Sequence, residues 1–194
     1  MELSKHIIAP YIIAGGNSLR MGEDKRLLSY MGMTLIERVY LLAEFVTGIK
    51  PVLVGNNFDS PFFQSFESIP DAANEKGPLT GIVAALEHSE SEWTLLLPVD
   101  MPRLNQEMLA ALVTNADDFS ESVTFIVGGF IECFPVLFRT AIRRFWRERL
   151  ESNRLSLIQG LKLIRNKTID FTAQEQFFLN LNTPKDVYRD QNSF

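Results

Sequence analysis

Residues 6–25, which decide the fold, read HIIAPYIIAGGNSLRMGEDK. The apolar run at positions 6–14 ends at two glycines, a pattern that is typical of a buried strand followed by a turn. In open α/β sheets, ligands lie beyond the carboxyl ends of the strands. We therefore predict that this first strand brings a glycine-rich loop to a ligand-binding edge of a sheet.

Strands and helices alternate along the rest of the chain. Several predicted helices begin at a residue that can cap a helix, such as Thr34 or Asn105. Such alternation indicates βαβ units, whose right-handed crossovers place helices on both faces of the sheet. We predict a three-layer αβα sandwich, Rossmann-like, with a mostly parallel twisted sheet and a single domain over residues 1–194. The predicted strands are 6–14, 50–54, 66–69, 93–98, 122–127, 135–138, 163–165 and 177–181, and the predicted helices are 34–45, 79–87, 105–113, 140–150, 155–161 and 183–189.

The composition excludes several classes of protein. The formal net charge of −5 argues against binding to nucleic acid, which needs cationic patches. No segment approaches the roughly 20 apolar residues that span a bilayer. The single cysteine, Cys133, excludes an intrachain disulfide, and we interpret it as a small buried hydrophobe. We therefore expect a cytoplasmic protein that binds neither membranes nor nucleic acid.

The loop at residues 14–25 has the composition of a phosphate-binding site. Its glycines, at positions 15, 16 and 22, allow backbone N–H groups to approach phosphate oxygens. Arg20 can bind a phosphate through two parallel hydrogen bonds, and Lys25 adds a compact positive charge. The spacing of the glycines matches neither the P-loop nor the dinucleotide-binding fingerprint, so P-loop NTPases and dinucleotide dehydrogenases are disfavoured.

A carboxylate follows the most apolar predicted strand, 93–98. Asp100 comes two residues after this strand, at the same expected sheet edge as the glycine-rich loop. Mg²⁺ prefers oxygen ligands and takes one or two carboxylates together with phosphate oxygens. Asp100 is therefore our candidate metal ligand, although an aspartate at this position can also cap a helix.

Several segments together resemble a known family. The stretch AGGNSLRMGEDKRLL, residues 14–28, is similar to the signature loop of the NTP-transferase superfamily, and most closely to that of molybdenum cofactor guanylyltransferases. PVDMP (98–102), GPLTGI (77–82) and NLNTP (180–184) resemble further motifs of that family. Ile13 and Leu19 depart from it, because the family usually has Leu and Arg there.

The resemblance implies transfer of GMP from GTP to the phosphate of molybdopterin, with Mg²⁺ as cofactor. It implies that the N-terminal half binds the nucleotide and the C-terminal half binds the acceptor. Asn180 and Asn182, two apart on a predicted strand, would bind the acceptor from one face, or would serve the start of the following helix. The implied catalytic residues are Arg20, Lys25 and Asp100, the implied metal ligand is Asp100, and the implied nucleotide-binding residues are Ile13, Ala14, Gly15, Gly16, Gly22, Lys25, Asn56, Asp71, Gly77 and Asp100.

Alternative functions stay open at this point. The order Ala14-Gly15-Gly16 resembles the guanylyl branch, whereas the cytidylyl branch tends to have Ala-Ala-Gly. A cytidylyltransferase, a sugar-phosphate nucleotidyltransferase and a non-catalytic nucleotide-binding protein are the rival hypotheses. The sequence leaves open the oligomeric state, a monomer included, and whether a molybdoenzyme or chaperone is a partner.

Overall fold

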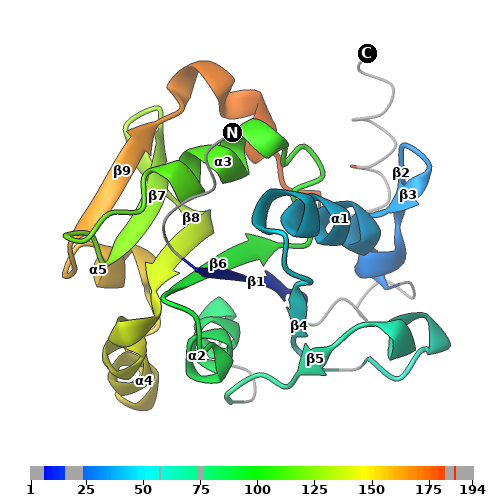
Figure 1. Ribbon diagram of the computed structural model, residues 1–194, viewed down its shortest axis with the longest axis horizontal. Coiled ribbons are helices and arrows are strands. Elements are labelled where there is room, and N and C mark those ends of the chain that lie inside the picture. The colour runs from blue at the N-terminus through cyan, green and yellow to red at the C-terminus, as the bar shows by residue number, and fades with distance from the viewer. Residues whose placement is uncertain (1–6, 16–23, 57, 74–76, 182–185, 187–194) are drawn as a thin grey trace.

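A seven-stranded mixed sheet forms the centre of the molecule (Figure 1). The computed structural model describes residues 7–15, 24–56, 58–73, 77–181 and 186. The strands of the sheet follow the order β5-β4-β1-β6-β8-β7-β9. They are β1 (Ile8–Ile13), β4 (Val52–Val54), β5 (Ser68–Ile69), β6 (Trp93–Pro98), β7 (Ser122–Val127), β8 (Phe130–Arg139) and β9 (Asn166–Asp170), and a separate small hairpin pairs β2 (Ser29–Tyr30) with β3 (Met33–Thr34).

The strands on one side of the sheet end at the same level. β1 pairs in parallel with β4 and with β6, and Ile13 is aligned with Val54 on one neighbour and Pro98 on the other. β8 is antiparallel to both β6 and β7, so it enters the sheet at the edge where β6 leaves it. The loops after β1, β4 and β6 and the beginning of β8 therefore meet at one edge of the sheet.

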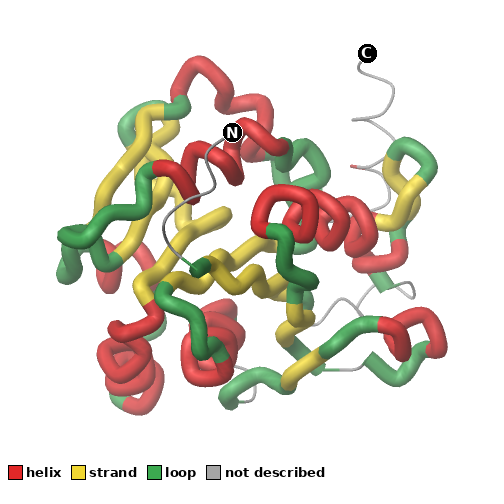
Figure 2. The backbone as a smooth tube through the Cα atoms, viewed as in Figure 1, coloured by secondary structure: helices red, strands yellow, loops and turns green. Residues whose placement is uncertain are grey.

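Helices cover both faces of the sheet, as the colouring in Figure 2 makes visible. Consecutive residues of a strand point to opposite faces. Ile12 accordingly packs in the core beneath α1 and α3, whereas Tyr11 packs in the core beneath α2 and α4. The prediction of a three-layer, mostly parallel fold is therefore confirmed. The helices are α1 (Leu35–Thr47), α2 (Pro78–His88), α3 (Gln106–Thr114), α4 (Arg143–Glu151) and the short α5 (Leu157–Leu161).

The predicted starts of two helices are confirmed by their hydrogen bonds. The Thr34 hydroxyl accepts from the backbone N–H of Glu37, and the Glu37 carboxylate accepts from the backbone N–H of Thr34, which completes a capping box at α1. Gly48 closes α1 in the left-handed conformation, and the side chain of Asn105 caps α3.

Three predicted elements were wrong or misplaced. The strand predicted at 163–165 lies at 166–170 instead; it is a polar edge strand in which Asn166 bonds to the hydroxyls on β7, so it has no apolar pattern to predict it. The strand predicted at 177–181 is the end of a 3-10 helix (Thr172–Phe178) followed by irregular chain, and its buried Phe178 and Leu181 resembled a strand. The helix predicted at 140–150 begins as a 3-10 turn.

Two further points concern the limits of the fold. The helix predicted at 183–189 falls outside the described residues except for Asp186. Within the described chain, no helix combines the length and the apolar content that crossing a bilayer requires.

Candidate functional site

A cavity of about 340 Å³ opens at the sheet edge where β1 and β6 end and β8 begins. We call it the sheet-edge cavity. Its volume falls within the range of roughly 300–1,000 Å³ that is usual for small-molecule sites. It is lined by Ile13 and Gly15 at the end of β1, residues 98–101 at the end of β6, residues 132–134 of β8, and Lys25, Pro78 and Asn180.

Two residues from distant parts of the sequence meet at this cavity. The Nζ atom of Lys25 donates a hydrogen bond of 2.9 Å to Oδ2 of Asp100. Lys25 belongs to a 3-10 helix (Lys25–Leu27) after the glycine-rich loop, and Asp100 follows β6. Their side chains are 24% and 22% exposed, so both charges remain accessible from the cavity. A phosphate and a cation could each take one member of this pair as a partner.

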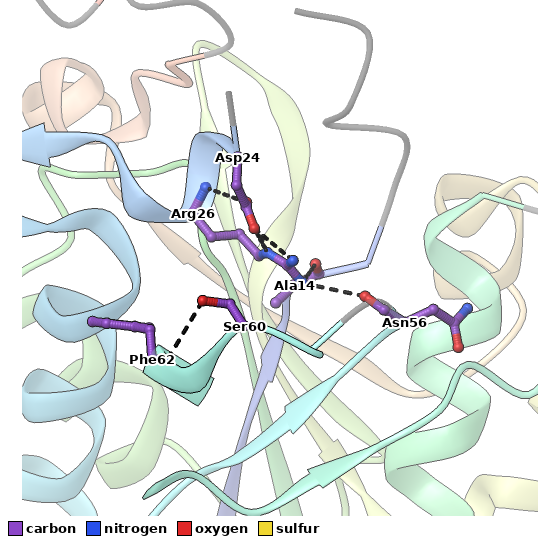
Figure 3. A network of polar contacts seen from close by, with 6 residues as sticks. All are labelled: Ala14, Asp24, Arg26, Asn56, Ser60 and Phe62. Carbon is purple, nitrogen blue, oxygen red and sulfur yellow. Dashed lines mark hydrogen bonds and ion pairs between the residues drawn. The ribbon is translucent and has the colours of Figure 1, made fainter. Parts of the chain in front are cut away.

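A buried arginine fixes the two ends of the glycine-rich loop (Figure 3). The guanidinium of Arg26 donates to both carboxylate oxygens of Asp24, at 2.8 Å and 2.6 Å, and to the backbone carbonyls of Ala14 and Asn56. It also stacks against the rings of two phenylalanines, and its residue is only 6% exposed. Arg26 was not among the residues predicted from the sequence, because its role depends on partners that are distant in the chain.

Asp71 lies beside the first glycine of the loop. Its carboxylate accepts from Nδ2 of Asn56 and from Oγ1 of Thr80, both at 3.3 Å. A Cβ atom on Gly15 would lie 2.7 Å from Oδ2 of Asp71, so the backbone approaches this carboxylate closely. Burial raises the pKa of the Asp71 carboxyl, against a smaller lowering by the bond from Thr80. Asn56, Asp71 and Gly15 therefore form one polar group at the ends of β1 and β4.

The N-terminus of α2 faces the same region. Gly77 precedes the helix with φ 68° and provides no side-chain cap, and Pro78 at the first turn lines the sheet-edge cavity. The free backbone N–H groups at a helix N-terminus favour an anion. Gly81, one turn further, has no side chain to separate α2 from Ile13 and Asp71. The positive end of the helix dipole therefore lies beside the cavity, while Pro78 has no N–H and the N–H of Thr80 donates to the carbonyl of Gly77.

The C-terminal part of the chain contributes to the cavity differently from the prediction. Asn180 lines the cavity, but it lies in irregular chain rather than on a strand, so the argument that Asn180 and Asn182 share a strand face was wrong. The backbone N–H of Leu181 donates to the carbonyl of Asp100 at 2.8 Å and holds this segment against the loop after β6. Gly16, Arg20, Gly22 and Asn182 lie outside the described residues.

The beginning of β8 provides cavity residues that the sequence analysis did not propose. Glu132, Cys133 and Phe134 all line the sheet-edge cavity and are partly buried. Cys133 is therefore not fully buried, in contrast to the prediction. Burial, together with the nearby charge of Glu132, raises the pKa of the Cys133 thiol, which disfavours a reactive thiolate.

The oxygen atoms at the cavity suit a hard cation. Asp100 offers a carboxylate whose Oδ2 atom accepts a hydrogen bond from Lys25, and Glu132 places a second carboxylate on the wall of the same cavity. Within the described part of the chain, no three His, Cys, Asp or Glu side chains are grouped closely enough to enclose a metal. This donor set fits Mg²⁺, which needs few protein ligands when phosphate oxygens and water complete its shell.

Comparisons with known proteins found a matching family model and named relatives. A family model described as the MobA-like NTP transferase domain matches residues 11–167. A Bacillus cereus protein named probable molybdenum cofactor guanylyltransferase is 28% identical over 192 residues, covering 94% of this chain and 95% of the relative.

Solved structures share the fold at lower identity. Molybdopterin-guanine dinucleotide biosynthesis protein A from Archaeoglobus fulgidus has a TM-score of 0.76 and 20% identity, with coverage of 95% of this chain and 97% of that one. The 4-diphosphocytidyl-2C-methyl-D-erythritol synthase from Anaerococcus prevotii has a TM-score of 0.72 and 14% identity, covering 96% and 95%. At these identities the likeness concerns the fold alone.

Proposed function

Because the chain belongs to the family of MobA-like NTP transferase domains, we propose that it transfers GMP from GTP to the terminal phosphate of molybdopterin and releases pyrophosphate. The observation that carries the proposal is the meeting of Lys25 and Asp100 at a cavity beside the uncapped N-terminus of α2. The curated relative named as a molybdenum cofactor guanylyltransferase aligns with nearly the whole chain and supports this choice of substrates.

The proposed reaction needs alignment and charge neutralisation more than covalent help. An oxygen of the acceptor phosphate attacks the α-phosphorus of GTP, a new P–O bond forms, and the bond to pyrophosphate breaks. The attacking phosphate is already an anion, so no general base is required. Lys25, together with Arg20 of the loop, would neutralise the charge that develops on the departing pyrophosphate.

The nucleotide half of the site is proposed to lie over the ends of β1 and β4. Ile13, Ala14 and the glycines would bring the backbone close to the phosphates, and the N-terminus of α2 after Gly77 would face them. Asn56 and Asp71 would contact the nucleoside, and their mutual hydrogen bond already orders both side chains.

Mg²⁺ is the proposed metal, and Asp100 would hold it with Lys25 displaced toward phosphate. When bound, the ion would neutralise phosphate charge during transfer. The acceptor half of the site is proposed to include Asn180 and Asn182, of which Asn180 lines the sheet-edge cavity.

A turnover assay tests this proposal. The purified protein is incubated with molybdopterin, Mg²⁺ and GTP or CTP, and pyrophosphate release is measured together with the dinucleotide product. We expect release with GTP, little with CTP, and none after chelation of the metal by EDTA. A preference for CTP would contradict the guanylyl assignment, and no release with any NTP would contradict the assignment as a transferase.

A further inference from the structure

Glu132 occupies a distinctive position at the sheet-edge cavity. In the register between β6 and β8, Leu96 is aligned with Val136, so the beginning of β8 extends past the end of β6 toward the edge where the glycine-rich loop lies. Glu132 belongs to this extension and lines the cavity together with Lys25, Asp100 and Asn180.

Among the described residues, the carboxylate of Glu132 has no polar partner. Lys25 bonds to Asp100, and Asn56 and Thr80 bond to Asp71, but Glu132 has neither a hydrogen bond nor an ion pair with any described residue. It is nevertheless partly buried, and burial raises the pKa of its carboxyl. Because Glu132 faces the cavity, a ligand that enters can supply the hydrogen-bond donors that water supplies in the empty protein.

The sheet order indicates which substrate lies near Glu132. Asn56, at the end of β4, belongs to the polar group that is proposed to bind the nucleoside, and β8 lies three strands away in the order β4-β1-β6-β8. Neighbouring strands are about 4.8 Å apart, so the two positions are separated by roughly 14 Å along the sheet. Glu132 is therefore on the acceptor side of the transferred phosphate.

We propose that Glu132 accepts hydrogen bonds from the 2-amino-4-oxopyrimidine edge of the acceptor's pterin and thereby determines which acceptor is used. A pterin presents a ring N–H beside an exocyclic amine on that edge, and a carboxylate has two oxygens at matching spacing. The half-buried ring of Phe134 adds aromatic surface on the same wall of the cavity. This inference rests on the proposed function, because it takes molybdopterin as the acceptor.

Guanine has the same edge, so the test must separate the two ligands. The probes are 6-hydroxymethylpterin phosphate and its lumazine counterpart, in which the exocyclic amine is replaced by a carbonyl. Equilibrium binding of each is measured by the fluorescence of the ring, and binding of GTP is measured by calorimetry. We expect the wild-type protein to prefer the pterin by at least about tenfold, since the lumazine loses one charge-assisted bond and presents an oxygen to the carboxylate.

The variant Glu132→Gln should lose this preference. Its amide can donate to the lumazine carbonyl but opposes the pterin amine, so the selectivity should fall to about onefold or reverse. The affinity for GTP should stay within about twofold, and the KM for molybdopterin should rise at least about tenfold. The control Glu107→Gln, an exposed carboxylate in the first turn of α3, should change none of these values.

Several outcomes would overturn the inference. It fails if Glu132→Gln keeps the pterin preference of the wild-type protein. It also fails if this variant weakens the binding of GTP alone, or if the wild-type protein binds no pterin. If the wild-type protein turns over molybdopterin but the variant keeps its acceptor KM, the inference fails and the proposed function stands. If the wild-type protein binds the pterin selectively but shows no turnover, the proposed function fails. The pterin preference of Glu132→Gln then decides whether Glu132 recognises the pterin.

Discussion

Lys25 and Asp100 illustrate how a single ion pair can matter more for chemistry than for stability. Their side chains are about one quarter exposed, and ion pairs that water can reach contribute only about 0–1 kcal/mol to folding. By contrast, a charged group that stabilises a transition state contributes about 3–4 kcal/mol to the rate. Replacing either side chain should therefore change the free energy of unfolding little and lower kcat strongly.

Replacing Asp100 tests this contrast directly. The variant Asp100→Asn should lower kcat by at least about a hundredfold and change the free energy of unfolding by less than about 1 kcal/mol. Turnover is measured by pyrophosphate release, and stability by urea denaturation. The exposed Asp59→Asn serves as a control for loss of one negative charge. Near-normal turnover in Asp100→Asn would refute the proposed role of this carboxylate.

At the scale of elements, the turn after β4 is the tightest point of the site. Gly55 has φ 146°, and a Cβ atom there would lie 2.6 Å from the backbone of Gly15. Hydrogen bonds from Ala14 to Val54 and from Gly55 to Ile69 hold the ends of β1, β4 and β5 together. The contact is between two backbones, so no side-chain movement can relieve a clash there.

The variant Gly55→Ala should therefore be costly. We expect it to lower the free energy of unfolding by about 3 kcal/mol, and to reduce GTP binding because Gly15 must move. Gly48→Ala is the matched control: it also has a positive φ, 72°, but open space around its Cα, so it should cost only about 1 kcal/mol. Equal losses in denaturant titrations of the two variants would show that the close approach is unimportant.

The success of prediction from sequence also differs among elements. Buried strands such as β1 and β6 were predicted because every position in them is apolar or nearly so. β9 was misplaced because a polar edge strand, held by Asn166, has no such pattern. The hairpin of β2 and β3 went unpredicted because each strand has only two residues.

The candidate site could be predicted where a motif is local, and not where it depends on contacts across the fold. The glycine-rich loop and Asp100 each follow a strand directly, so the rule about carboxyl ends of strands applied to them. Arg26 was missed because its role depends on hydrogen-bond partners that are distant in the sequence. Glu132 was missed because its role depends on the lack of a polar partner among the described residues. Asn180 was found by resemblance, although its local conformation was predicted wrongly.

At the scale of the whole molecule, the C-terminal segment links the core to the site. Phe178 and Leu181 are buried in the core that α1 and α3 cover, although neither belongs to the sheet. The backbone of Leu181 also bonds to the carbonyl of Asp100. Packing near the end of the chain therefore helps to position the loop that carries the candidate metal ligand.

Truncating Leu181 tests this connection. The variant Leu181→Ala should lower the free energy of unfolding by about 2–5 kcal/mol and should also lower kcat at temperatures where the protein stays folded. Leu112→Ala removes an equally buried side chain from the same core, but Leu112 lies within α3 and is not bonded to Asp100, so this variant should lower stability and leave kcat unchanged. Equal kcat values for both variants would show that Leu181 acts on stability alone.

The reversed direction of β8 has a consequence for how such proteins diversify. The loops after β1, β4 and β6 leave the sheet at the edge where β7 ends and β8 enters after a tight turn. The nucleotide wall of the cavity is thus encoded by βα units, and the wall that carries Glu132 is encoded by β8, which runs in the opposite direction. Under the proposed assignment of these walls, mutations within that one strand can recruit new acceptors during evolution, while the machinery that activates the nucleotide is inherited intact.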